Sequence, residues 1–381
     1  TVATARFGGR NWTIFSALAL LVPTLLTLYF INQPGTSFTT FLIVAAFAGV
    51  GGGNFASSMT NINAFYPQRL KGWALGLNAG GGNVGVPAMQ IIGLLVIAFV
   101  SKTAPEIVCA IYLVLCGLAA LGAALFMDNL SNQQADLRNM RRVLRFRDSW
   151  VMSFLYIGTF GSFIGFSFAF GQILNINFAA TDPKTAALHA AQIAWIGPLL
   201  GSISRPIGGK LSDRIGGGKV TLYTFVAMMG AAAILVIAGI LDDNDGRNGA
   251  GAGIMTTYVL AFILLFILSG LGNGSTYKMI PSIFEAKSKS IPGDRAVQAA
   301  WSRNMSGALI GFAGAIGAFG GVLINLVLRQ SYVSSASATS AFIVFLVFYV
   351  VCAIVTWAVF LRTPTEAEAL TIDDDKVSVS A

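Results

Sequence analysis

The stretch Gly208-Gly-Lys-Leu-Ser-Asp-Arg-Ile-Gly-Gly-Gly-Lys219 decides the fold, because it is short, charged and glycine-rich between two long apolar segments. Arg205 and Pro206 stand just ahead of it. Apolar neighbours on both sides predict a turn at a membrane surface. A partial copy, Arg6-Phe-Gly-Gly-Arg10, lies at the start of the chain. Two copies of one segment, about half a protein apart, predict two related halves.

The composition predicts a membrane protein. Of 381 residues, 55% are hydrophobic and 10% are charged, whereas an ordinary soluble domain carries roughly 25% charged residues. Apolar runs of about 20 residues recur and do not alternate with polar residues, which favours spanning helices over a barrel. We therefore expect an all-α membrane protein. The predicted spans are 13–32, 39–66, 73–100, 106–127, 150–175, 187–207, 220–241, 254–284, 296–328 and 341–361.

The basic residues predict the orientation. The net charge of +8 could indicate nucleic acid, but the basic residues lie mostly in alternate turns between the spans, so we expect no nucleic-acid partner. Positively charged turns stay in the cytoplasm. The alternation therefore predicts a multi-pass protein of the cytoplasmic membrane, in contact with the lipid bilayer. Both ends of the chain are expected on the cytoplasmic side.

The repeat predicts the domain organisation. The full copy has two spans before it in its half, 150–175 and 187–207, and the partial copy has none, while four spans follow each copy. If the halves are repeats of six, a twelve-helix protein has lost its first two helices in this chain. The expected parts are an incomplete N-terminal four-span bundle (1–127), a cytoplasmic linker (128–149), a C-terminal six-helix bundle (150–362) and an acidic cytoplasmic tail (363–381).

Glycine clusters occur at matching places in the two halves. Small residues let membrane helices approach closely, and close packing is one explanation of the clusters. Their occurrence on matching helices also predicts surfaces that slide or rock during a conformational change. The residues expected to act in gating are Gly51, Gly52, Gly53, Gly208, Asp213, Arg214, Gly272 and Gly274.

Charged residues inside the spans are scarce. No Asp, Glu or His lies in the middle of a predicted span, which disfavours a cationic substrate and weakens the case for a carboxylate proton relay. Arg205 lies toward the cytoplasmic end of 187–207, where its side chain could snorkel to the interface. Alternatively, its permanently charged guanidinium could bind an oxyanion through parallel N–H donors in a low dielectric.

Aromatic and amide side chains complete the candidate binding site. Tyr156 and Phe160 are one turn apart and share a face, and Phe55 follows the glycine run of the second span. Such rings could sandwich a flat anion or could simply pack in the core. Asn78 and Asn83 lie within an apolar span, where an unpaired amide is costly, so we expect interhelical bonding or ligand contact.

No feature of the sequence indicates catalysis. Cys109, Cys116 and Cys352 lie inside apolar runs without metal-ligand spacing and are expected to pack as small hydrophobes. His189 is expected to have a structural or interfacial role. The glycine runs lie within apolar helices and not after a strand, so a dinucleotide loop is not expected. We expect no enzyme activity, no cofactor and no bound metal.

These residues also carry a resemblance. The stretch 208–219 resembles the loop motif of the major facilitator superfamily. The stretch 51–90, with Ala74-Leu-Gly-Leu-Asn-Ala-Gly-Gly-Gly-Asn-Val-Gly85, and the stretch 272–280 resemble signatures of the nitrate/nitrite porter (NarK-type) family. The resemblance implies two six-helix bundles, of which this chain holds ten helices, with a central site and alternating access. It also implies nitrate and nitrite as substrates.

The resemblance further implies a set of binding residues. Two arginines would clamp the anion, of which the second matches Arg205. The first has no counterpart, because the chain begins just after its expected position, and Ala5 replaces an Asp common in the superfamily loop. The aromatic and amide contacts of the family match Phe55, Asn83, Tyr156 and Phe160.

The function predicted from the sequence is therefore transport. We expect a monomer that exchanges nitrate for nitrite, because a positive site without an anion is unfavourable and its empty return should be slow. Nitrate–proton symport stays open, as does a carrier of the same superfamily for another anion or a drug. A membrane receptor that binds nitrate without moving it is the remaining class.

Overall fold

The computed structural model describes residues 2–100, 104–129, 141–245 and 249–362. The expected tail (363–381) and half of the expected linker (130–140 of 128–149) lie outside the described residues. Within the described residues, ten helical segments are long and apolar enough to cross a membrane, which confirms the ten predicted spans. The segments are Gly9–Ile31, Phe38–Phe65, Gln68–Phe99, Pro105–Phe126, Arg147–Thr181, Ala186–Ile215, Gly217–Asn244, Ala252–Ser288, Arg295–Ser335 and Thr339–Leu361.

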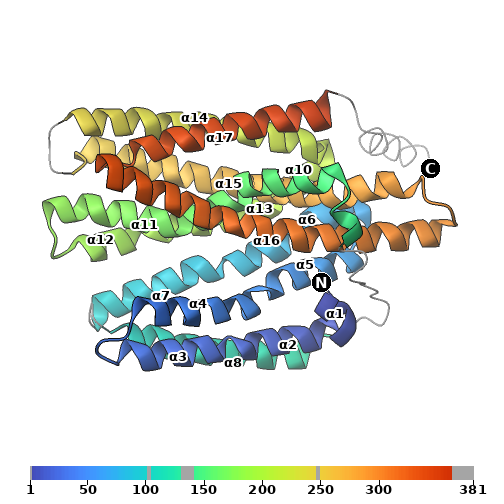
Figure 1. The fold of residues 1–381 in the computed structure, drawn as a ribbon, viewed down its shortest axis with the longest axis horizontal. Coiled ribbons are helices and arrows are strands. Elements are labelled where there is room, and N and C mark those ends of the chain that lie inside the picture. Colours follow the sequence, from blue (N-terminus) through green and yellow to red (C-terminus); the bar gives the residue numbers. More distant parts are fainter. Residues whose placement is uncertain (1, 101–103, 130–140, 246–248, 363–381) are drawn as a thin grey trace.

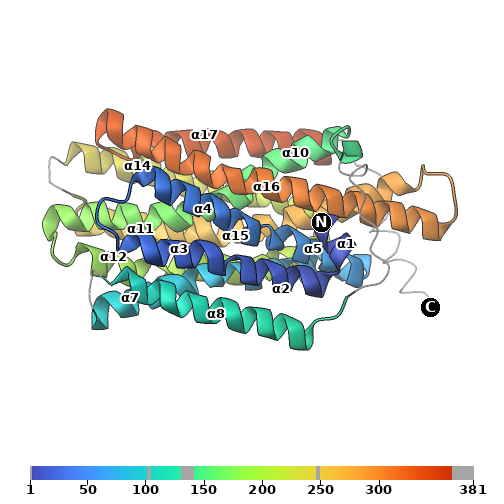
Figure 2. The ribbon, with the colours of Figure 1, turned by 60° about the horizontal axis from the view of Figure 1, so that its bottom comes forward.

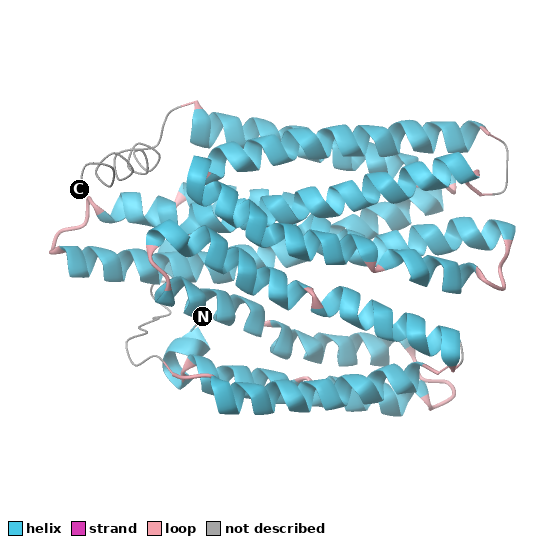
Figure 3. Ribbon diagram, turned by 180° about the vertical axis from the view of Figure 1, so that it is seen from behind, coloured by secondary structure: helices cyan, strands magenta, loops and turns pink. Residues whose placement is uncertain are grey.

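The helices form two groups that lie side by side, and Figures 1 and 3 show both groups from opposite faces. In Figure 2 the first group comes forward, with α2, α3 and α8 adjacent to one another. The first group contains α1 (Val2–Phe7), α2 (Gly9–Ala19), α3 (Leu21–Ile31), α4 (Phe38–Gly52), α5 (Asn54–Phe65), the short 3₁₀ turn η1 (Gln68–Leu70), α6 (Lys71–Asn83), α7 (Gly85–Phe99) and α8 (Pro105–Phe126).

The second group follows in the chain and holds most of the buried core. It contains α10 (Arg147–Tyr156), the π-helical turn η2 (Ile157–Gly161), α11 (Ser162–Thr181), α12 (Ala186–Ala194), α13 (Ile196–Ile215), α14 (Gly217–Asn244), α15 (Ala252–Ser288), α16 (Arg295–Ser335), α17 (Thr339–Thr356) and the π-helical turn η3 (Trp357–Leu361). The two groups meet where α6 packs on α13 and α15, α5 packs on α16, and α7 packs on α12 and α13.

The stretch 208–219 differs from the predicted turn. Helix α13 continues through Gly208 to Ile215, and α14 begins at Gly217, so the connection is the single residue Gly216. The φ of Gly216 is 91°, which a glycine adopts without a Cβ clash. The helix extends because its charged last turns pack on neighbouring helices, and those contacts stabilise more than local turn preference does.

The partial copy at the start of the chain has the same geometry. Gly8 separates α1 from α2 with φ 86° and ψ 153°, and Gly216 separates α13 from α14 with φ 91° and ψ 136°. Each copy is therefore a helix, one glycine in a left-handed φ region, and a second helix. The matched backbone supports the predicted kinship of the two segments.

Candidate functional site

The centre of the candidate site is Arg205, which α13 holds between the two helix groups. Its side chain is completely buried, at 0% exposed, so it does not snorkel to the interface in this conformation. Its Nη2 donates to the Tyr156 hydroxyl at 2.6 Å. Within the described residues, no carboxylate forms an ion pair with it. A buried charge without a counterion costs several kcal/mol, so the site favours an anion.

Aromatic rings surround the guanidinium. The Arg205 Cζ lies 5.5 Å from the Phe55 ring centroid, 5.2 Å from Phe160 and 5.5 Å from Tyr277. A cation over a ring face is stabilised by about 2 kcal/mol when desolvated. The ring of Phe55 comes from α5 of the first group, and the other two rings come from the second group. The cluster therefore joins both groups around one cation.

The predicted sandwich of a flat anion is closed in this conformation. Phe55 and Phe160 stack directly, with centroids 5.2 Å apart and planes 8° apart. Tyr156 continues the stack on Phe160 at 4.9 Å. An anion can enter between Phe55 and Phe160 only when these rings separate.

The π-helical turn η2 positions two of these residues. Tyr156 is the last residue of α10, and Phe160 lies within η2. A π-helical turn widens the helix by one residue and occurs often at functional sites. Close contact with α16 holds this turn, because the Cα atoms of Gly161 and Gly320 face each other where no side chain would fit. The aromatic stack therefore stands on a wide turn that glycine contacts keep in place.

Several polar atoms around the cluster are buried without a hydrogen-bond partner. They include Nε and Nη1 of Arg205, Nδ2 of Asn83, and both amide atoms of Asn273. An unsatisfied buried donor costs about 1–3 kcal/mol. Most of these atoms are N–H donors, which is the arrangement that an acceptor-only oxyanion would satisfy.

The two asparagines predicted for the site have different surroundings. Asn83 ends α6 and is 8% exposed, one turn beyond Gly80, where a Cβ would lie 3.6 Å from the Arg205 Cβ. Asn78 remains inside α6, and its Nδ2 donates to the Ser58 hydroxyl at 3.0 Å. The structure places Gly80, one turn before Asn83, against Arg205, whereas Asn78 bonds α6 to α5.

A row of glycines lets α6 approach α13. Added Cβ atoms at Gly76 and Gly80 would lie 2.8 Å from the Arg205 carbonyl oxygen and 2.6 Å from the Ser202 carbonyl oxygen. Gly72 faces Gly209 even more closely. These glycines recur every fourth residue and form one face of α6. The contact between the two helix groups beside Arg205 therefore depends on glycines, which have no side chain to separate the backbones of α6 and α13.

We expect Gly76→Ala to destabilise this conformation by about 1–3 kcal/mol, because the new methyl group meets backbone atoms that cannot rotate away. The measurement is the melting temperature of the purified protein. The matched control is Gly81→Ala, since Gly81 lies in the same helix and has nothing within 4 Å of an added Cβ. Equal melting temperatures of the two variants would contradict the proposed contact.

A buried ion pair joins the two helix groups at the end of the molecule that carries the α13–α14 connection. Asp213 pairs with Lys278 of α15 at 2.9 Å, and the two side chains are 9% and 5% exposed. Asp213 also accepts from the backbone N–H groups of Gly72 (3.0 Å) and Trp73 (2.8 Å) at the start of α6. The N-terminus of a helix attracts an anion. Lys278 further donates to the Gln68 carbonyl at 2.6 Å, so these residues bond the two groups.

The other predicted gating residues have distinct positions. Gly208 packs on Leu271, and Gly274 packs on the backbone of Arg205 and Gly209. Gly272 packs on Thr159. Gly51 faces Leu20, Gly52 has an open surrounding, Gly53 separates α4 from α5, and Arg214 is exposed at the end of α13. Of these glycines, Gly274 lies directly against Arg205.

The sequence did not predict four residues that lie near Arg205 and its aromatic rings or in the Asp213–Lys278 ion pair. They are Thr159, Asn273, Tyr277 and Lys278. Three of them lie within the stretch 272–280, in which only Gly272 and Gly274 were predicted to act, as gating residues. A cation inside an apolar span was the available signal for Lys278, and an amide beside two glycines was the signal for Asn273.

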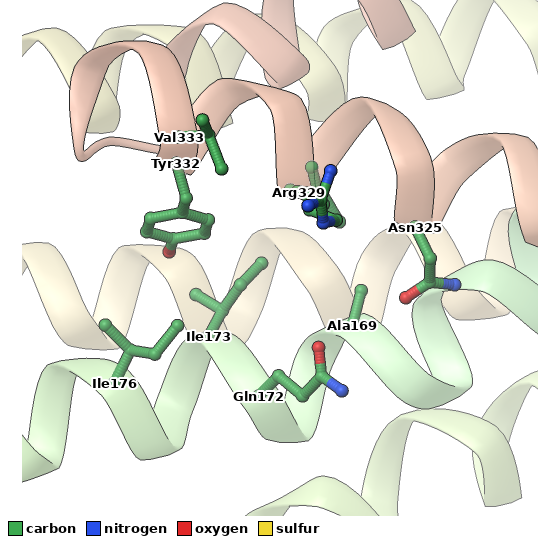
Figure 4. Close-up of a pocket in the computed structure, with 9 residues that line it drawn as sticks. Ala169, Gln172, Ile173, Ile176, Asn325, Arg329, Tyr332 and Val333 are labelled. Carbon is green, nitrogen blue, oxygen red and sulfur yellow. The ribbon is translucent and has the colours of Figure 1, made fainter. Parts of the chain in front are cut away.

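One cavity of about 490 Å³ lies away from the arginine cluster, between α11 and α16 (Figure 4). Polar and apolar side chains line it, among them Gln172, Asn325, Arg329 and Tyr332. Its α11 residues begin at Ala169, nine positions beyond Phe160, which is about 14 Å along a helix. The cavity is therefore separate from the site built around Arg205.

Comparisons with known proteins place this chain in a family. Residues 2–315 match the Major Facilitator Superfamily profile. The chain is 35% identical to the nitrate/nitrite transporter NarU of Escherichia coli (strain K12), over 93% of this chain and 78% of the relative. The chain belongs to the nitrate/nitrite porter family of the major facilitator superfamily. The porter is also 30% identical to the probable nitrate/nitrite antiporter NarK2 of Thermus thermophilus, over 94% of its own chain and 79% of that protein.

Solved structures agree on the fold of the porter. The transporter FucP in the outward conformation matches with a TM-score of 0.60 and 13% identity, over 91% of this chain and 82% of that one. The human organic anion transporter MFSD10 matches with a TM-score of 0.61, also at 13% identity, over 93% and 78% of the two chains. The predicted fold class is therefore confirmed, and the porter is a multi-pass membrane protein.

Proposed function

We propose that this porter carries nitrate and nitrite across the cytoplasmic membrane by alternating access. The observation that carries the proposal is the state of Arg205. It is completely buried, has no carboxylate partner in the described residues, and leaves Nε and Nη1 without acceptors. Small flat oxyanions offer the acceptors and the negative charge that this guanidinium lacks. The names of the similar proteins support the same substrates.

We assign Arg205, Tyr156, Phe160, Phe55 and Asn83 to substrate binding. Arg205 supplies charge and N–H donors, and the rings supply flat surfaces that match a flat anion. Because Phe55 belongs to one helix group and Phe160 to the other, the rings separate when the groups rock apart. Binding and opening are thereby coupled at a single contact.

We assign Asp213 and Lys278 to closure of the cytoplasmic side. The basic turns of the sequence orient that end toward the cytoplasm. Closure at that end leaves Arg205 without a path to the cytoplasm in this conformation. At the other end of the site, Gln90 of α7 donates to the Ser167 carbonyl of α11 at 3.1 Å. Contacts of both kinds must break in alternation during one cycle.

Exchange is the transport mode that this electrostatics favours. The empty site holds an uncompensated cation, and moving it through the closed state carries a desolvation penalty of several kcal/mol. An anion in the site removes that penalty on each passage. The porter therefore returns faster with a second anion than empty, which makes it a nitrate/nitrite antiporter. We further propose that it acts as a monomeric carrier without a catalytic step.

The decisive experiment is counterflow in liposomes that contain the full natural protein. Nitrite is trapped inside, labelled nitrate is supplied outside, and the run is repeated with an imposed proton gradient. We expect nitrate to enter rapidly and to accumulate regardless of the gradient. Uptake that needs the gradient but no internal nitrite would identify a proton symporter. No movement of either anion by folded protein would refute the proposed function.

A further inference from the structure

Asn273 lies inside α15 with no partner for its side chain. It is 0% exposed, and neither Nδ2 nor Oδ1 forms a hydrogen bond. Two other asparagines of the described helices bond to the protein through the side-chain amide nitrogen. Asn325 donates to the Gly321 carbonyl at 2.8 Å, and Asn177 donates to the Ile173 carbonyl at 2.9 Å. A fully buried amide with both atoms free has no structural task in this conformation.

Helix geometry directs this amide toward the arginine cluster. Successive residues of an α-helix are about 100° apart, so positions 273 and 277 point about 40° from each other. Tyr277 lies over the Arg205 guanidinium and 4.7 Å from the Tyr156 ring. On its other side, position 272 faces Thr159 of η2. Asn273 therefore points into the space between α13 and η2, one turn along α15 from Tyr277.

The polar atoms of this space match a three-oxygen anion. The Arg205 guanidinium can bind two oxygens with parallel N–H donors. The Asn273 amide supplies a further N–H donor from another helix. Thr159, whose Oγ1 also has no partner and which is 0% exposed, can donate its hydroxyl to the Asn273 Oδ1. That bond would turn the amide so that Nδ2 faces the anion.

We infer that Asn273 is a specificity-determining residue, whose Nδ2 donates to the third oxygen of nitrate while Arg205 holds the other two. The inference rests on the proposed function. Nitrite has only two oxygens and leaves the amide without an acceptor. A site that hydrogen-bonds one group of a substrate rejects the analogue that lacks it, because a buried polar atom is then unpaired. Asn273 therefore favours nitrate over nitrite.

The test compares the two anions in Asn273→Leu, which has nearly the same shape and no polar atom. Each unlabelled anion competes with labelled nitrite counterflow in liposomes. We expect the half-inhibitory concentration of nitrate to rise about tenfold or more, and that of nitrite to change less than about threefold. Equal changes for both anions, or no change for either, would overturn the inference. Wild-type protein in the same liposomes reports separately on the proposed function, since its own failure to exchange would refute that.

Thermal unfolding separates recognition from structure. Because Asn273 bonds to nothing in this conformation, Asn273→Leu should melt no lower than wild type without anion, and a given nitrate concentration should raise its melting temperature less than that of wild type. The matched control Asn325→Leu removes a bonded amide and should melt lower, with unchanged anion preference. If Asn273→Leu melts as low as the control and keeps the wild-type preference, the inference is wrong. Asn273→Ser, a smaller change with the same readouts, replaces it if the leucine variant does not fold.

Discussion

Arg205→Lys is expected to lower nitrate/nitrite exchange at least about 100-fold while the helices stay folded. Lysine retains a charge but loses the bond to the Tyr156 hydroxyl, the planar contact with three rings, and the parallel donors. A charge-assisted hydrogen bond contributes about 1.5–3 kcal/mol, and a desolvated cation–π contact contributes about 2 kcal/mol. Since 1.4 kcal/mol corresponds to a factor of ten, these losses reach the expected effect.

The measurement is the initial rate of counterflow at saturating nitrate, with circular dichroism as the check on folding. The matched control is Arg329→Lys, because Arg329 is an exposed arginine on α16 that lines the cavity away from the site. The control should exchange at the wild-type rate. Wild-type exchange by Arg205→Lys would remove Arg205 from the binding site and with it the proposed mechanism.

Lys278→Met is expected to shift the porter toward the state that is open to the cytoplasm. The change leaves the buried Asp213 carboxylate without its cation, and breaking one side of a buried pair costs about 3–5 kcal/mol. Moving a two-state equilibrium from 1:99 to 99:1 takes about 5.5 kcal/mol, so most molecules of the variant should leave the closed state. Counterflow should then nearly stop, because one half of the cycle becomes unfavourable.

Accessibility measures this shift. A cysteine in place of Ser282, whose hydroxyl accepts from Gln68 across the two helix groups at 3.3 Å, should react with a charged thiol reagent far faster in Lys278→Met. The protein without the added cysteine gives the background. The double variant Asp213→Asn with Lys278→Met removes both charges and should recover part of the closed state, as in a double-mutant cycle. Equal labelling of all forms would show that the ion pair does not close the porter.

The sequence predicts the spans well because their signal is local. A run of about 20 apolar residues predicts a membrane-spanning helix without reference to any other part of the chain. Each of the ten segments contains such a run. Arg205 could be selected for a similar reason, as a cation beside several glycines within an apolar segment. Tyr156 and Phe160 follow from helical spacing alone, and the structure places both against Arg205.

Partners far apart in the chain could not be predicted. Nothing in the sequence around Lys278 indicates that it pairs with Asp213. Lys278 was therefore not predicted as a functional residue. Asn78 and Asn83 look equivalent in sequence, yet only the structure shows that Ser58 engages Asn78. The prediction of a turn over 208–219 was wrong. Glycine and charged residues usually favour a loop, whereas contacts with α6 and α15 extend α13 to Ile215 here.

The wide turn η2 makes the length of one helix as important as its composition. Tyr156 and the residues of α10 before it are displaced along the helix by the additional residue of this turn. If the same residues wound as a regular α-helix, everything before this turn would rotate by about 100° relative to α11. Tyr156 would then face away from Arg205 although every side chain of the site was still encoded. Substitutions of the site residues change how strongly the site binds the anion, whereas a change in the winding of this turn would move Tyr156 out of the site.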